Sequence, residues 1–183
     1  MINTIKWSAA STIMNAFTGS ISNAYNYVKA LDGSLTDIRI VTGYSKDQMD
    51  EFANSANKAA QALGRQTKEY TNAALTFYQQ GLSDDEVQVR TETTLKAANI
   101  TGAEASSVAD QLTAVWNGFQ VSLEDTEDIV SKMAAVADSS ASNMSELATA
   151  MSRVASVANN MGVDVDQLNA QIATIIATTR QAP

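Results

Sequence analysis

Cysteine and histidine are both absent from this chain of 183 residues. Their absence excludes disulfides, zinc sites built from thiolates and imidazoles, and catalytic relays in which a histidine activates a serine or cysteine. The single proline is the last residue, so no proline interrupts a helix within the chain. Aromatic residues make up only 6% of the chain, and alanine dominates the hydrophobic 45%. We therefore expect helices that approach closely but bury little area per side chain.

Positive charge is also scarce: 12 Lys and Arg stand against 20 Asp and Glu, a formal net charge of −8. The basic residues are scattered singly, so they form no patch for a nucleic-acid backbone or an anionic membrane. The longest strongly apolar run, Ile172 to Ala177, is far shorter than the roughly 20 residues that a membrane-spanning helix needs. Residues 1–7 have one positive charge and no long apolar run, unlike a secretory signal. The sequence predicts neither nucleic-acid binding nor a membrane span.

Glycines and capping residues divide most of the chain into helical segments. Glycine ends a helix because it enters the left-handed conformation without a Cβ clash, and Ser, Thr or Asp begins the next by accepting a bond from a first-turn amide. The predicted ends are Gly43, Gly64, Gly81, Gly102, Gly118 and Gly162, and the predicted starts are Ser45, Thr67, Ser83, Ser122 and Asp164. Gln or Glu follows three residues after Ser45, Ser83 and Asp164, which is the capping-box spacing. Residues 138–145 are small and polar and predict a loop.

Apolar residues recur at steps of three and four in these segments, for example at Leu147, Met151 and Val154. This is the periodicity of amphipathic helices, and no stretch shows the alternation of a strand. The sequence therefore predicts an all-α fold. It consists of a long N-terminal amphipathic helix followed by a bundle of about seven short-to-medium helices after residue 44.

Residues 1–43 differ from the rest, because a single apolar stripe runs through about seven helical turns. The stripe consists of Ile13, Phe17, Ile21, Ala24, Val28, Leu31, Leu35 and Ile38. A long stripe with few caps indicates a helical arm or coiled-coil segment that packs on a partner, although packing along its own bundle fits the pattern equally well. We predict an arm at residues 1–43 and a compact helical domain at residues 44–183.

Catalytic and metal chemistry find little support in the sequence. The acidic groups 84–86 and 124–128 fall in predicted first helical turns, where carboxylates face the positive end of the helix dipole. Asp164 and Asp166 resemble the start of a calcium loop, but the glycine and the distant glutamate of an EF-hand do not follow. No glycine pattern of a nucleotide site occurs. We expect no catalytic residue, no cofactor and no metal.

A W-x-G sequence at Trp116, Asn117 and Gly118 supports a rival interpretation. It resembles the motif of the small secreted WXG proteins of type VII secretion, which are dimeric helical hairpins. In that family the motif separates two long helices in a chain about half this length. The alternative for these residues is a tryptophan that covers the core where a helix stops at a glycine.

Taken in order, many short segments of the chain resemble the conserved region of phage tail tape measure proteins. They are LTDI (35–38), VTGYS (41–45), ALGRQT (62–67), FYQQGL (77–82), TTLKAA (93–98), WNGF (116–119), VADSS (136–140), MSRVA (151–155), MGV (161–163), IATI (172–175) and TTRQ (178–181). The resemblance lies in their order and spacing and covers residues 30–181.

The resemblance implies a non-enzymatic assembly protein of a phage tail, located in the virion and, during assembly, in the host cytoplasm. Such proteins lie in several copies inside the tail tube and set its length; the implied partners are further copies, the tail tube protein, tail-tip proteins and tail assembly chaperones. Members of the family are usually far longer, so we interpret the chain as a fragment, truncated at its C-terminal end. The candidate protein-contact residues are Ile13, Phe17, Ile21, Tyr25, Val28, Trp116 and Phe119, and burial is the alternative for the last two.

Overall fold

The structure, a computed structural model, describes the backbone of residues 3–140 and 142–180 and the side chains of residues 22–140 and 142–179. These residues form eight α-helices and no strand. The helices are α1 (Asn3–Thr42), α2 (Lys46–Ala62), α3 (Thr67–Gln79), α4 (Asp84–Thr101), α5 (Ala105–Phe119), α6 (Thr126–Ser139), α7 (Met144–Asn160) and α8 (Val165–Arg180). The predicted all-α class is confirmed, as are the seven helices after residue 44.

Helix ends follow the predicted chemistry at most junctions. Five of the predicted glycines, Gly43, Gly64, Gly81, Gly102 and Gly162, have φ between 67° and 79° and end α1, α2, α3, α4 and α7. The left-handed conformation explains why glycine stands at these positions. Capping boxes begin α2 at Ser45 and α4 at Ser83, and a third begins α7 at Asn143.

Two predicted helix starts are wrong by a short distance. Thr67 is the first residue of α3, which begins after Gln66, and the Thr67 hydroxyl donates instead to Asn57 Oδ1 at 2.8 Å. Ser122 caps a separate turn, in which its Oγ accepts from the Asp125 amide at 3.3 Å, and α6 begins only at Thr126. In both cases the hydroxyl group takes part in a different hydrogen bond instead of capping the predicted helix.

The predicted helix end at Gly118 is also wrong, because α5 continues through Gly118 to Phe119 and ends at Gln120 with φ of 54°. Instead, the missing side chain of Gly118 leaves room for α7 to lie close to α5. A Cβ built at Gly118 would lie 2.6 Å from the Cβ of Ala155 and 2.8 Å from the amide nitrogen of Ser156. The absence of a side chain thus lets the two backbones come together.

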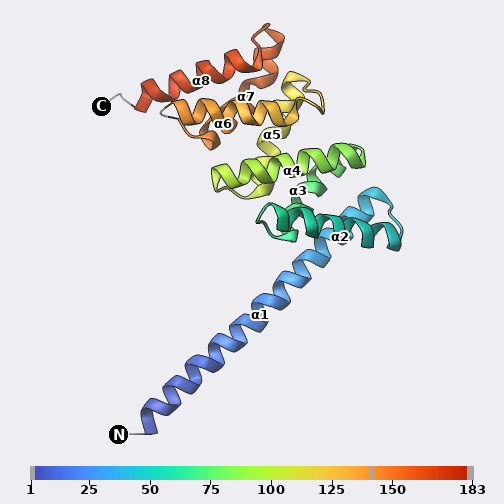
Figure 1. Cartoon of the computed structure of the whole chain (residues 1–183), viewed down its shortest axis with the longest axis vertical. Coiled ribbons are helices and arrows are strands. Elements are labelled where there is room, and N and C mark those ends of the chain that lie inside the picture. Colours follow the sequence, from blue (N-terminus) through green and yellow to red (C-terminus); the bar gives the residue numbers. More distant parts are fainter. Residues whose placement is uncertain (1–2, 141, 181–183) are drawn as a thin grey trace.

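The helices pack in two rows (Figure 1). In one row α1, α3, α5 and α7 contact one another in that order, and in the other α2, α4, α6 and α8 do the same. Contacts between the rows join helices that are close in the chain, such as α3 with α4 and α7 with α8. The most extensive contact is that of α5 with α7. The N-terminal part of α1 extends away from all the other helices.

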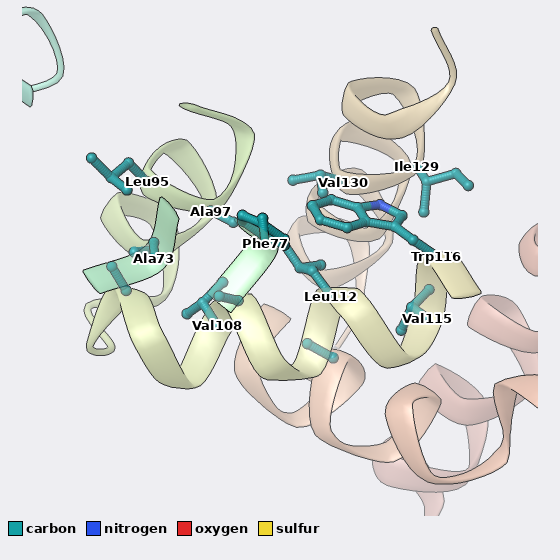
Figure 2. Close-up of a cluster of buried hydrophobic side chains, with 14 of the residues drawn as sticks. Ala73, Phe77, Leu95, Ala97, Val108, Leu112, Val115, Trp116, Ile129 and Val130 are labelled. Carbon is teal, nitrogen blue, oxygen red and sulfur yellow. The ribbon is translucent and has the colours of Figure 1, made fainter. Parts of the chain in front are cut away.

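The core runs along the whole double row. Its largest fully buried side chains are Trp116, Phe77, Ile38, Leu95, Leu112, Met133, Leu147, Met151, Val87, Val108 and Val115, together with the polar Asn169. Figure 2 shows Trp116 of α5 in one cluster with Phe77 of α3 and Val130 of α6. The ring centroids of Phe77 and Trp116 are 6.1 Å apart. Alanines fill much of the remaining interior, which fits the predicted close packing of helices.

We predict that Gly118→Ala lowers the free energy of unfolding by about 1–3 kcal/mol, measured by urea denaturation of the whole chain. Alanine is normally the better helix former by about 1 kcal/mol, but here its methyl group overlaps the backbone of α7. Gly33→Ala is the matched control, because Gly33 also lies within a helix, α1, and a Cβ there meets nothing within 4 Å. Gly33→Ala should be neutral or stabilising. Equal effects of the two substitutions would contradict the packing role of Gly118.

Candidate functional site

The exposed stretch of α1 is the first candidate interaction surface. Tyr25 is 68% exposed and Val28 is 63% exposed, although both are large hydrophobic residues. They belong to the predicted contact set, and their position on the projecting part of α1 makes them available to a partner. The side chains of Ile13, Phe17 and Ile21, which complete the α1 part of that set, lie outside the described residues.

The last turns of α1 are attached to α3. The side chain of Ile38 is completely buried, and Ser34 is buried as well. The hydroxyls of Ser34 and Thr71 lie 2.6 Å apart in this contact, and Ser34 also donates to the Leu31 carbonyl at 3.0 Å. The two small polar side chains therefore satisfy each other where the helices meet. The arm is thus anchored at one end, while the division into domains at residue 43 stays a prediction.

Trp116 and Phe119 lie in the core, which was the alternative expected for them. The side chain of Trp116 is completely buried, and Phe119 is half-buried against the same core. The guanidinium of Arg90 lies 5.2 Å from the centre of the Trp116 ring, a cation–π contact. Burial lowers the pKa of Arg90, which is only 7% exposed. The W-x-G residues therefore serve helix packing: the tryptophan fills the core and the glycine admits α7.

The predicted acidic clusters act as caps and ion-pair partners. Glu86 accepts from the Ser83 amide at 2.9 Å and from the Ser83 hydroxyl at 2.7 Å. Both bonds lower the pKa of Glu86 below its ordinary 4.5, and the bond from the backbone amide has the larger effect. Lys132 lies 3.0 Å from both Asp128 and Asp166, so it joins α6 to α8, and hydrogen bonds to Asp166 and then Asp128 raise its pKa to about 12.

Two positions in these clusters differ from the prediction. Glu124 and Asp125 precede α6 instead of lying in its first turn, because the turn capped by Ser122 comes before the helix. Asp164 caps α8 by accepting from the Gln167 amide at 2.7 Å.

Among the residues that the structure describes, no group of three or more acidic side chains is placed to hold a metal ion. No helix within the described ranges is long and apolar enough to cross a membrane.

A pocket of about 260 Å³ opens between α2, α3 and α4. Four aromatic side chains line it: Tyr44, Phe52, Tyr70 and Tyr78. Three carboxylates line it as well: Glu51, Asp84 and Glu92. Sequence reasoning did not find this pocket, because its residues are spread over the junction before α2 and three helices. No local motif connects them.

Hydrogen bonds and burial fix the tyrosines of the pocket. Tyr44 donates to Asp84 Oδ1, and its hydroxyl oxygen lies 3.4 Å from that of Tyr78. Burial raises the pKa of Tyr78 and of Tyr44, and for Tyr44 the bond to Asp84 adds to the effect. Burial and then the charge of Glu92 raise the pKa of Tyr70 to about 12. All three hydroxyls are therefore protonated at neutral pH, and the carboxylates provide the negative charge of the pocket.

The family model of the phage-related minor tail proteins matches residues 57–183. The matched region includes the last turn and a half of α2 and all of α3 to α8. A structural tail family indicates a non-enzymatic protein. No solved structure matches the chain.

We predict that the capping bond of Glu86 makes a pH-dependent contribution to stability. Because its folded pKa is lowered from 4.5, this contribution is present above about pH 4.5 and is lost as the pH falls through the folded pKa. The difference in urea midpoint between wild type and Glu86→Gln should therefore narrow from about pH 6 to about pH 3. Glu104→Gln is the control, since Glu104 precedes α5 without a side-chain capping bond. A constant difference for Glu86→Gln would refute the charged cap.

Proposed function

The chain belongs to the family of phage-related minor tail proteins, and we propose that it is part of the tape measure protein of a phage tail. In this role it sits in the tail tube in several copies, sets the length of the tail and contacts tail-tip proteins. The order and spacing of the segments from residue 35 to residue 181 that resemble tape measure proteins support this assignment.

The shape of α1 is the observation that carries the proposal. Its 40 residues make a rod of about 60 Å at 1.5 Å per residue, and most of that rod stands away from the bundle (Figure 1). A helix in water owes most of its stability to the packing of an apolar face. The exposed Tyr25 and Val28 give α1 apolar surface that its own bundle does not cover. Further copies of the same helix in a narrow tube supply that cover.

The bundle α2–α8 has a different role in the proposal. Its helices fold back on one another in two rows, so its length does not grow by 1.5 Å for each residue added. A compact unit of this kind suits docking on the tail tube protein, on tail-tip proteins or on tail assembly chaperones. The net charge of −8 suits a protein that leaves the tube before DNA passes and does not hold the nucleic-acid backbone.

The WXG interpretation finds no support. The matched family is one of phage tail proteins. Gly118 lies inside α5 instead of separating two helices of a hairpin, and the described residues form seven further helices besides α5. The resemblance at Trp116 is therefore limited to two residues of α5, a tryptophan in the core and a glycine at the contact with α7.

The first test locates the chain in the virion. Tryptic peptides of residues 22–179 should appear, by mass spectrometry, in tails of purified phage particles separated from heads. Peptides found only in the culture supernatant and never in virions would overturn the tail assignment. This experiment tests location and leaves the ruler role to the next one.

The ruler role predicts a dependence of tail length on α1. An insertion of about 70 residues that continues the helical pattern of α1 should lengthen the tail by about 105 Å, at 1.5 Å of rise per residue, in electron micrographs. The matched control is the same insertion between α6 and α7, where the chain folds back and no comparable lengthening is expected. Tails of unchanged length with the α1 insertion would refute the ruler role. The location result would be unaffected.

A further inference from the structure

The pocket between α2, α3 and α4 has a continuous aromatic lining. The ring of Tyr78 contacts Tyr44 at a centroid distance of 6.1 Å and Phe52 at 5.8 Å, both nearly edge-to-face. Phe52 in turn lies 6.5 Å from Tyr70. The four rings thus form one row, contributed by the junction before α2 and by helices α2 and α3. Aromatic rings carry negative potential on their faces, so a row of this kind attracts cations.

The charged side chains of the pocket all have one sign. Glu51, Asp84 and Glu92 line it, and no lysine or arginine does. Glu92 is half-buried, and Gln88 donates to its Oε1 at 3.0 Å, which holds the carboxylate in place. Carboxylates beside a low-dielectric aromatic wall concentrate a negative field in the pocket. That field would repel an anion.

Tyr70 offers the pocket a hydroxyl that no other described residue uses. Its side chain is only 4% exposed and lines the pocket, yet its hydroxyl has no hydrogen-bond partner among the described residues. The hydroxyl oxygen is not among the fully buried side-chain atoms that lack a partner, so it is accessible from the pocket. A phenol that stays protonated at neutral pH still accepts one bond from an N–H donor. A ligand with several N–H groups would satisfy Tyr70 and a carboxylate at the same time.

We propose that this pocket binds one alkylguanidinium cation, stacked on the aromatic row and paired with Glu92. A guanidinium is planar, stacks on aromatic rings and presents donors in a fork that matches a carboxylate, whereas an ammonium is a compact, strongly hydrated charge. Two sources carry this group: an arginine side chain of another protein, or a free alkylguanidine. The inference does not depend on the tape measure role.

Titration of the whole chain tests the site, with n-butylguanidinium followed by two-dimensional proton–nitrogen NMR. We expect shifts confined to α2, α3 and α4, including the side-chain amides of Gln48 and Gln88, with Kd on the order of 1 mM. Butylurea has nearly the same shape without the charge and should not bind measurably. Butylammonium should bind at least threefold more weakly than butylguanidinium. Equal binding of butylurea, or no shifts in these helices, would overturn the proposal.

Two variants of equal charge assign the role of Glu92. Glu92→Gln should weaken binding of butylguanidinium at least fivefold, whereas Asp110→Asn, an exposed change on α5 away from the pocket, should leave Kd unchanged. Thermal unfolding confirms that both variants are folded. Equal losses in the two variants would show general attraction to an acidic protein and would refute the pocket.

A second probe distinguishes the two sources of the cation. N-acetyl-arginine amide presents the same side chain on a peptide backbone. Binding of both probes with the same pattern of shifts supports a site for an arginine of a partner protein. Binding of butylguanidinium alone supports the cation site and assigns it to a free alkylguanidine.

Discussion

The close approach of α5 and α7 at Gly118 is the contact on which the rest of the structure depends. In the odd-numbered row, α5 touches α3 on one side and α7 on the other. A methyl group at Gly118 would overlap both the side chain of Ala155 and the backbone beside it. The two helices therefore meet nearly backbone to backbone. Such contact lets a chain with few aromatic residues build a continuous core, because alanine then fills the narrow space that remains.

The two-row arrangement makes the molecule almost one-dimensional. Each helix contacts mainly its neighbours in its own row and the adjacent helices of the other row. In such arrays stability is close to a sum of local units and the interfaces between them. The interface of α5 with α7 is the most extensive of these. In the other row, the ion pair of Lys132 on α6 with Asp166 on α8 joins these two helices, but such an exposed pair adds little stability on its own.

The sequence was sufficient for the fold class, because helical periodicity and glycine ends are local signals. It failed at Gly118 because glycine has two uses, a left-handed backbone and a missing Cβ. Only the position of Ala155 on another helix decides between them. The cap at Thr67 failed for a similar reason, since Asn57 on α2 bonds to its hydroxyl. The pocket is a tertiary product of the same kind: Tyr44, Tyr70 and Glu92 share no period and meet only when three helices pack.

The arm and the pocket lie at the same end of the bundle and are connected through Tyr44. Tyr44 follows the glycine that ends α1, and its backbone carbonyl accepts from Arg39 Nε at 3.3 Å. Its hydroxyl reaches the first residue of α4, Asp84. One side chain therefore connects the base of α1, the wall of the pocket and the start of α4. Because the contact of Ser34 with Thr71 already joins α1 to α3, the direction of the arm and the shape of the pocket are set by the same packing of α3 against its neighbours.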